Sequence, residues 1–276
     1  MSRTLALVLV LWVGSLAPST AHGQSSFDLF GSARADALAN GTTADPAAVG
    51  VHANPAARAD VATPTAVFYA RQSFGLAALR YGASHVVAPL DWGTASIGAS
   101  TFGFDEYREI HASAGYARSL PLGTARRIHL GATLRYYHTA IAEYGNAAAF
   151  GINVGFIVSL IRSLRLGAHA SNVNGATLVN REPIPRTLAV GLRYDALSRV
   201  TVMVDAFKDV RFPATLRGGL EVRPVSPLAL RAGITTAPVR FTAGAGVRLG
   251  LLCADLALEQ HQVLGWSPSA SLRVQW

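Results

Sequence analysis

Residues 128–137 read IHLGATLRYY, and residues 150–158 read FGINVGFIV. In the first stretch, apolar side chains at the even positions alternate with residues such as His129, Gly131 and Arg135. The second stretch repeats the alternation, with glycine and asparagine between its apolar residues. Successive side chains of a β-strand point to opposite faces, so this period of two predicts strands with one apolar face and one polar face.

The same alternation continues on both sides of these stretches, from about Thr65 to Trp276. Proline and glycine interrupt it and predict turns, among them residues 121–123, 224–227 and 265–268. The four earliest runs are less regular, and we expect strands near residues 65–71, 76–87, 93–104 and 108–120. The pattern predicts about fourteen strands, in line with the even strand numbers of bacterial membrane barrels.

The composition of the two faces indicates which one points outward. The polar face carries glycine, serine, threonine and single arginines, which suit a narrow, crowded interior better than the surface of a soluble sandwich. The apolar face carries aromatic residues near strand ends, at Tyr116, Tyr136, Tyr194 and Trp276, as in an interfacial aromatic belt. These features predict an all-β fold, a transmembrane antiparallel β-barrel with its apolar face toward lipid.

Bulk composition agrees with this prediction. Half of the 276 residues are hydrophobic and only 14% are charged, against about 25% in typical soluble domains. After the N-terminus no run of about 18 apolar residues occurs, so the sequence offers no transmembrane helix. A soluble exported β-protein is the alternative to the membrane barrel.

The N-terminus predicts export. Arg3, an apolar stretch from Leu5 to Val13, and small residues at Ala21 and Gly23 form the pattern of a cleaved signal peptide over residues 1–23. Residues 24–62 are rich in Ala, Asn, Asp and Gly and alternate poorly, so we expect an N-terminal hatch or plug segment there. Residues 63–276 then form the barrel. These domains place the protein in the bacterial outer membrane, in contact with its lipid.

Charge and cysteine content exclude several classes. The net charge of +8 comes from single, scattered arginines, so a nucleic-acid partner is not expected. The lone Cys253 can form neither an intrachain disulfide nor a zinc cluster, and the histidines lack metal-ligand spacing. His111 and Ser113 share a strand face without an evident acidic partner. We therefore expect no cofactor and no enzymatic activity.

Charged residues on the polar face form a candidate lumen lining. If they face the interior, neighbouring strands place opposite charges within pairing distance. The lining then either selects anions and guides polar head groups or, as we favour, forms a structural ladder of charge pairs, because unpaired buried arginines are costly. The candidate residues are Arg135, Arg165, Arg193, Asp205, Arg217, Glu221, Arg231, Arg248, Asp255 and Arg273.

Short motifs along the chain resemble a known family. Residues 31–35 (GSARA), 44–48 (ADPAA) and 54–56 (NPA) resemble the N-terminal signature of PorV/PorQ-type outer-membrane proteins, which belong with the FadL-like barrels. Later motifs follow in the same order, at residues 102–105, 171–175, 185–188, 217–221, 230–233 and 241–247. The sequence departs from the family at residues 38–41, where the usual Met-Gly-Gly is replaced, and at Ala53, where an aromatic residue is usual.

The resemblance implies a fourteen-stranded barrel with its N-terminal segment in the lumen. It also implies either passage of small hydrophobic solutes or an accessory role in type IX-like protein secretion, with a hydrophobic ligand or secretion components as partners. A plugged structural barrel without transport is the competing hypothesis.

Two terminal features belong to this interpretation. Asn54, Pro55 and Ala56 form a hatch motif, which either contributes to a gate or only bends the chain into the first strand. The final Trp276 resembles the C-terminal aromatic signal read by the barrel-assembly machinery, which we therefore expect as a partner.

Overall fold

The computed structural model describes residues 29, 31–123, 126–178 and 183–276. The predicted signal peptide, residues 1–23, lies outside the described residues. No helix in the described part of the chain is both long and apolar enough to cross a membrane.

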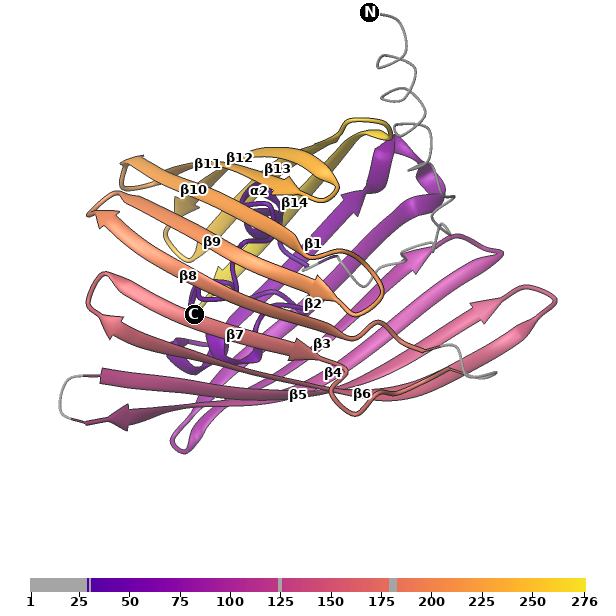
Figure 1. Cartoon of the computed structure of the whole chain (residues 1–276), viewed down its shortest axis with the longest axis horizontal. Helices are drawn as coiled ribbons and strands as arrows, with labels where there is room; N and C mark the ends of the chain where they lie inside the picture. Colours follow the sequence, from indigo (N-terminus) through magenta and orange to yellow (C-terminus); the bar gives the residue numbers. More distant parts are fainter. Residues whose placement is uncertain (1–28, 30, 124–125, 179–182) are drawn as a thin grey trace, which may run out of the picture.

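Fourteen antiparallel strands in the described residues form one closed barrel (Figure 1), which confirms the predicted fold class and strand number. Each strand pairs with its neighbours in sequence, and β1 pairs with β14 to close the wall. The strands are β1 Thr65–Gln72, β2 Arg80–Leu90, β3 Gly93–Gly103, β4 Tyr107–Leu122, β5 Arg126–Ile141, β6 Gly145–Ile161, β7 Leu164–Ser171, β8 Thr187–Leu197, β9 Val200–Asp209, β10 Thr215–Val225, β11 Leu228–Thr236, β12 Val239–Leu249, β13 Leu252–His261 and β14 Gly265–Gln275.

The closing seam runs from Thr65 opposite Gln275 to Arg71 opposite Ser269. The backbone N–H of Trp276 donates to the carbonyl of Pro64 at 3.1 Å and extends the seam by one bond. Because both edge strands are paired, no edge of the sheet is left open, as a hydrocarbon environment requires.

Several predicted boundaries are wrong. Residues 73–79 form two short 3-10 turns, η3 Ser73–Gly75 and η4 Ala77–Leu79, so β2 begins at Arg80 and not at Leu76. The cause is local, because Phe74 and Gly75 adopt left-handed backbone conformations that end an extended strand. The predicted turns at residues 121–123 and 265–268 lie largely within β4 and β14, near strand ends where a proline removes only one ladder donor.

The apolar faces of the strands form the outer surface of the barrel. Ile97 and Leu256, for example, are each 64% exposed, and similar side chains follow along every strand. A continuous apolar surface around a closed barrel is far larger than the patches that soluble monomers expose. This arrangement fits a barrel surrounded by lipid and argues against the soluble exported alternative.

The two ends of the barrel differ. At the end that carries Trp276, the strands are joined by connections of two or three residues, such as Asp91–Trp92 and Ser198–Arg199. We call this the short-turn end. At the opposite, long-loop end the connections reach fifteen residues, between Ser171 and Thr187.

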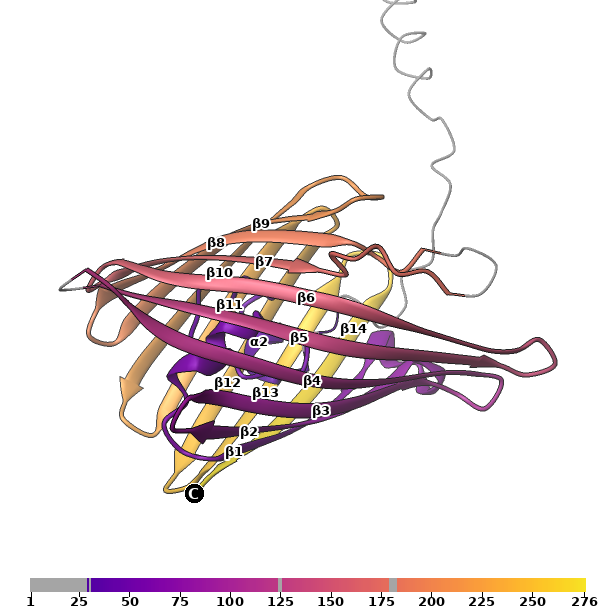
Figure 2. The same cartoon turned by 90° about the horizontal axis from the view of Figure 1, so that it is seen from below.

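Residues 31–62 occupy the interior of the barrel (Figure 2). We call them the inner segment. It contains the short helix α2, Ala33–Ala37, which packs against β11 to β14, and the 3-10 helix η2, Pro55–Asp60, which packs against β3 to β6. The segment therefore crosses the lumen from one side of the wall to the other, and most of its residues are buried.

Candidate functional site

Glycines on the inner face of the wall make room for the inner segment. A Cβ atom built on Gly131 would lie 2.5 Å from the backbone nitrogen of Ala56, and one on Gly167 would lie 2.7 Å from the Cα of Ala44. Real Cβ atoms do not approach backbone so closely. At these glycines the backbone of the inner segment meets the wall.

Asn54 fixes the inner segment to β6 and β7. Its Nδ2 donates to the carbonyls of Thr43 (2.8 Å), Phe156 (3.1 Å) and Ala168 (3.2 Å). Its Oδ1 accepts from the backbone N–H of Ala56 at 3.0 Å and so caps η2. The predicted hatch motif therefore holds this end of the segment on the wall, while its part in a gate stays a prediction.

Buried ion pairs centred on Asp45 hold the middle of the inner segment. Asp45 is 0% exposed and pairs with Arg34 of the same segment and with Arg193 of β8. Burial alone would raise the pKa of Asp45, but the two guanidinium groups hold that pKa below its usual value. This carboxylate is therefore ionised in its buried position, and it links the segment to the wall.

Arg34 extends the network to a second part of the wall. Its Nε donates to Glu221 of β10 at 3.0 Å. Glu221 also accepts from Arg231 of β11 at 2.7 Å, and Arg231 donates to Asp255 of β13 at 2.7 Å. Neighbouring strands thus place arginine and carboxylate groups opposite one another, and the inner segment contributes one further arginine to the ladder.

A third anchor lies at α2. The carboxylate of Asp36 accepts from the hydroxyls of Tyr69 (2.6 Å) and Ser269 (2.7 Å) and lies 3.5 Å from Arg71, which also pairs with Glu259 at 2.8 Å. Burial raises the pKa of Asp36, and these polar partners offset part of the rise. The anchor fastens α2 to the seam between β1 and β14.

On the opposite side of the lumen, two buried arginines bond to uncharged groups. Arg135 of β5 bonds to His52 and donates to the carbonyl of Val51 at 2.9 Å, whereas Arg58 donates to the hydroxyl of Thr133 at 2.7 Å. Burial lowers the pKa of His52 well below its ordinary value, and the charge of Arg135 lowers it further. His52 is therefore neutral and can accept from Arg135.

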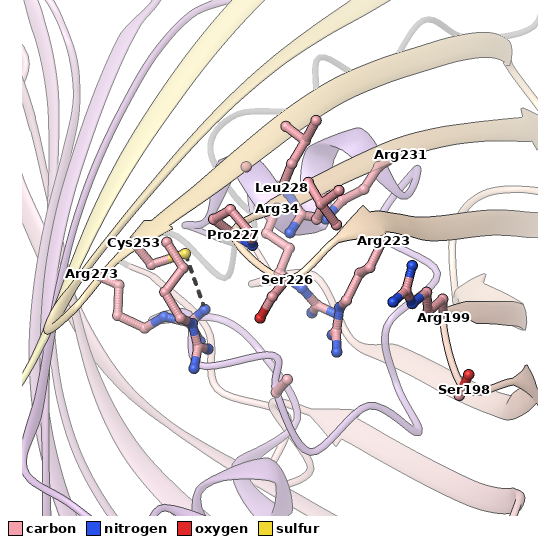
Figure 3. Close-up of a pocket in the computed structure, with 15 residues that line it drawn as sticks. Arg34, Ser198, Arg199, Arg223, Ser226, Pro227, Leu228, Arg231, Cys253 and Arg273 are labelled. Atoms are coloured by element: carbon pink, nitrogen blue, oxygen red, sulfur yellow. Dashed lines mark hydrogen bonds between the residues drawn. The ribbon is translucent and has the colours of Figure 1, made fainter.

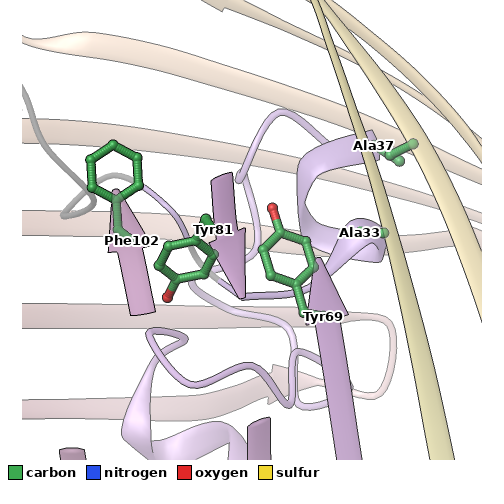
Figure 4. Close-up of a cluster of buried hydrophobic side chains, with 6 residues drawn as sticks. Ala33, Ala37, Tyr69, Tyr81 and Phe102 are labelled. Atoms are coloured by element: carbon green, nitrogen blue, oxygen red, sulfur yellow. The ribbon is translucent and has the colours of Figure 1, made fainter. Parts of the chain in front are cut away.

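One part of the inner wall carries a cluster of three aromatic rings. Tyr69 of β1, Tyr81 of β2 and Phe102 of β3 lie side by side on the lumen face, next to Ala33 and Ala37 of α2 (Figure 4). We call the three rings the aromatic patch. The rings of Tyr69 and Tyr81 meet edge to face, with centroids 5.7 Å apart. The two other buried apolar clusters between the wall and the inner segment are aliphatic and contain Val49, Val67 and Val87, and Ala56, Ala57 and Ile157.

The predicted lumen residues fall into two groups. One group is buried against the inner segment or within the wall: Arg135, Arg193, Asp205, Arg217, Glu221, Arg231 and Asp255. The other group lies near the short-turn end and is half-buried or exposed: Arg165, Arg248 and Arg273. Arg217 lies directly opposite Asp205 across β9 and β10 and stacks over the ring of Phe207 at 3.6 Å. The first group favours the structural ladder, whereas the second remains accessible.

Sequence reasoning missed the residues of the inner segment that complete the network. Arg34, Asp36, Asp45 and Arg58 were not singled out, although each is a charged residue in an alanine-rich stretch. That contrast was the available signal, because a charge in an otherwise apolar, poorly alternating segment needs a partner if it is buried. No group of three or more His, Cys, Asp or Glu residues in the described part of the chain could hold a metal ion.

Solved structures share this architecture. The toluene transporter TbuX of Ralstonia pickettii is similar at a TM-score of 0.63 and 12% identity, over 91% of this chain and 100% of that chain. The monoaromatic hydrocarbon channel CymD gives 0.65 and 11%, over 92% and 99%. A FadL homologue of Pseudomonas aeruginosa gives 0.56 and 11%, over 92% and 99%. At these identities the likeness establishes a FadL-like barrel fold.

No protein-family model matches the sequence, and no curated protein matches it significantly. The resemblance to PorV/PorQ proteins is therefore confirmed only at the level of the FadL-like fold.

Proposed function

We propose that this protein is an outer-membrane channel for small hydrophobic solutes, with the inner segment as its gate. The observation that carries the proposal is the aromatic patch, a cluster of three rings on the inner wall directly beside α2. Stacked and edge-to-face rings bind flat apolar solutes well, because they bury apolar area at fixed geometry. The solved barrels TbuX and CymD, which share the fold, carry toluene and monoaromatic hydrocarbons.

The outer surface supports a location in the outer membrane. Leucine, valine, isoleucine and phenylalanine side chains cover the wall, and the strands pair in a closed barrel. In barrels of this class the short connections face the periplasm and the longer loops face outward. The short-turn end is accordingly the periplasmic end in this proposal.

Passage requires the inner segment to move. The segment is held by Asn54, by the ion pairs of Asp45 and by the anchor at Asp36, all of which are non-covalent. Local opening of such a segment costs less free energy than unfolding of the wall, because the ladder bonds of the strands stay intact. A transient opening beside α2 would connect the aromatic patch to the rest of the lumen.

Two other hypotheses remain as outcomes of the test. The accessory role in type IX-like secretion, with secretion components as partners, finds no support in the comparisons and stays a prediction from the PorV/PorQ resemblance alone. The structural barrel without transport shares the same fold and differs only in that its inner segment never opens.

The experiment compares uptake of radiolabelled toluene by cells that express the protein in an outer membrane lacking other hydrocarbon channels. We expect faster uptake than in cells without the protein, and a reduction of at least fivefold in the double variant Tyr81→Ser, Phe102→Ser. The matched control is Phe241→Ser, because Phe241 lies on the outer face and is 48% exposed. Uptake equal to that of cells without the protein would refute the channel and leave the structural barrel and the secretion role.

A further inference from the structure

A basic cavity opens at the short-turn end of the barrel, and Figure 3 shows the residues that line it. None of the three rings of the aromatic patch lines it. Its volume is about 450 Å³, within the range of small-molecule sites. Among the described residues that line it there are six arginines and no aspartate or glutamate. The arginines are Arg34, Arg199, Arg223, Arg231, Arg248 and Arg273.

The register of the strands brings these arginines together. Arg248 of β12, Cys253 of β13 and Arg273 of β14 lie directly opposite one another in three adjacent strands. Arg199 comes from the β8–β9 turn and Arg223 from the end of β10, and the carbonyl of Arg199 accepts from the N–H of Arg223 at 2.9 Å. The cavity is therefore built by two short connections, β8–β9 and β10–β11, by strand residues near this end of the barrel, and by Arg34 and Ala47 of the inner segment.

Half of the positive charge is already neutralised. Arg34, Arg223 and Arg231 bond to the carboxylates of Asp45, Glu221 and Asp255, which lie behind the cavity wall. Within the part of the chain that the structure describes, the other three arginines have no carboxylate partner. These are Arg199, Arg248 and Arg273.

Two buried donors also lack acceptors. The Nη2 of Arg34, a residue only 4% exposed, and the Nε of Arg273 have no hydrogen-bond partner among the described residues. Both side chains line the cavity. A buried donor without an acceptor is unfavourable, and an anion in the cavity would satisfy such donors with charge-assisted bonds.

We propose that this cavity binds a small oxyanion, a molecule that presents a phosphate or carboxylate group. Planar guanidinium groups bind these oxygens in pairs, so Arg248 and Arg273 would hold the anion from one side while Arg199 and Arg223 approach from the other. The site is separate from the aromatic patch and does not depend on transport of hydrophobic solutes. The oxyanion comes either from a free periplasmic solute or from a lipid headgroup.

The test measures binding of inorganic pyrophosphate to the detergent-solubilised full chain by calorimetry. We expect saturable binding that weakens at least tenfold in the double variant Arg248→Gln, Arg273→Gln. The matched control is Arg162→Gln, an exposed arginine in the β6–β7 turn outside the cavity, which should change affinity by less than twofold. Folding of each variant is checked by heat-modifiable migration on a gel.

A second measurement uses Cys253, the only cysteine of the chain and part of the cavity wall. A negatively charged methanethiosulfonate, which bears a sulfonate, should modify Cys253 faster than the positively charged trimethylammonium reagent. Pyrophosphate should slow this modification. In the double variant, the two reagents should react at similar rates. Binding of short-chain phosphatidic acid without pyrophosphate binding would assign the anion to a lipid headgroup, and the reverse would assign it to a free solute. Absence of both, or unchanged binding in the double variant, would overturn the proposal.

Discussion

Replacement of Asp45 by asparagine should release the inner segment from the wall. The substitution keeps the shape of the side chain but removes the negative charge that lies between Arg34 and Arg193. Loss of one member of a buried ion pair costs about 3–5 kcal/mol, because the remaining charge stays buried without compensation. Arg34 keeps Glu221 and Arg193 keeps Asp195, so we take the lower value, about 3 kcal/mol.

A loss of about 3 kcal/mol raises the opening equilibrium of the inner segment by about a hundredfold, at 1.36 kcal/mol for each factor of ten. Hydrogen exchange measured by mass spectrometry reports this equilibrium directly for peptides that cover residues 31–62. We expect their amides to exchange about a hundredfold faster in Asp45→Asn, while peptides from β4 and β5 keep the exchange rates of the parent protein.

The control is Asp105→Asn. Asp105 also pairs with an arginine, Arg108 at 3.3 Å, but its side chain is 96% exposed. Exposed pairs contribute about 0–1 kcal/mol, so this variant should exchange like the parent protein. Equal exchange of residues 31–62 in Asp45→Asn and Asp105→Asn would refute the reasoning, because the buried network would then not hold the segment.

Three further results are expected. Gly131→Val places a side chain where the backbone of η2 now lies and should increase single-channel conductance by displacing the segment. Gly82→Val should not, because a Cβ atom there would meet only the side chain of Thr101, at an ordinary contact distance of 3.8 Å. Asn54→Ala removes a helix cap and three side-chain bonds and should speed exchange of residues 54–60 about tenfold, at about 1–2 kcal/mol. Burial and the charge of Arg135 depress the pKa of His52 while the segment is docked. As the pH falls below about 6.5, His52 therefore gains a proton only in the undocked segment. The free energy of docking weakens as a result, by up to about 1.4 kcal/mol per pH unit below that value. Exchange corrected for intrinsic rates should therefore accelerate up to about tenfold between pH 6.5 and 5.5, and less in His52→Gln.

Alternation of side chains was enough to predict the barrel and its strand number, because the alternation of apolar and polar residues can be recognised within each strand separately. The prediction failed at residues 73–79, where apolar residues continue the strand composition but Phe74 and Gly75 turn the backbone. A change of backbone conformation at two residues leaves little trace in a hydrophobicity pattern.

Only part of the candidate site could be predicted from the sequence. Alternation identifies which arginines face inward, such as Arg193 and Arg231, but it does not identify their partners. Arg193 pairs with Asp45, which is 148 positions away and lies in a segment without any regular period. The position of such a segment is decided by its docking on the wall, so its contacts follow from tertiary packing and not from a local pattern. The cavity of arginines likewise exists only because strand register aligns Arg248 with Arg273.

The chain connection between the inner segment and the wall has a kinetic consequence. Only residues 61–64 separate η2 from β1, and Pro64 is bonded to Trp276 at the seam. A released segment thus stays tethered to the barrel, at an effective concentration in the millimolar range. Reclosure is a first-order process whose rate does not change with dilution of the protein, and each barrel can close only itself. A cut between η2 and β1 would convert the same contacts into a bimolecular equilibrium, in which closure depends on how much free segment is supplied.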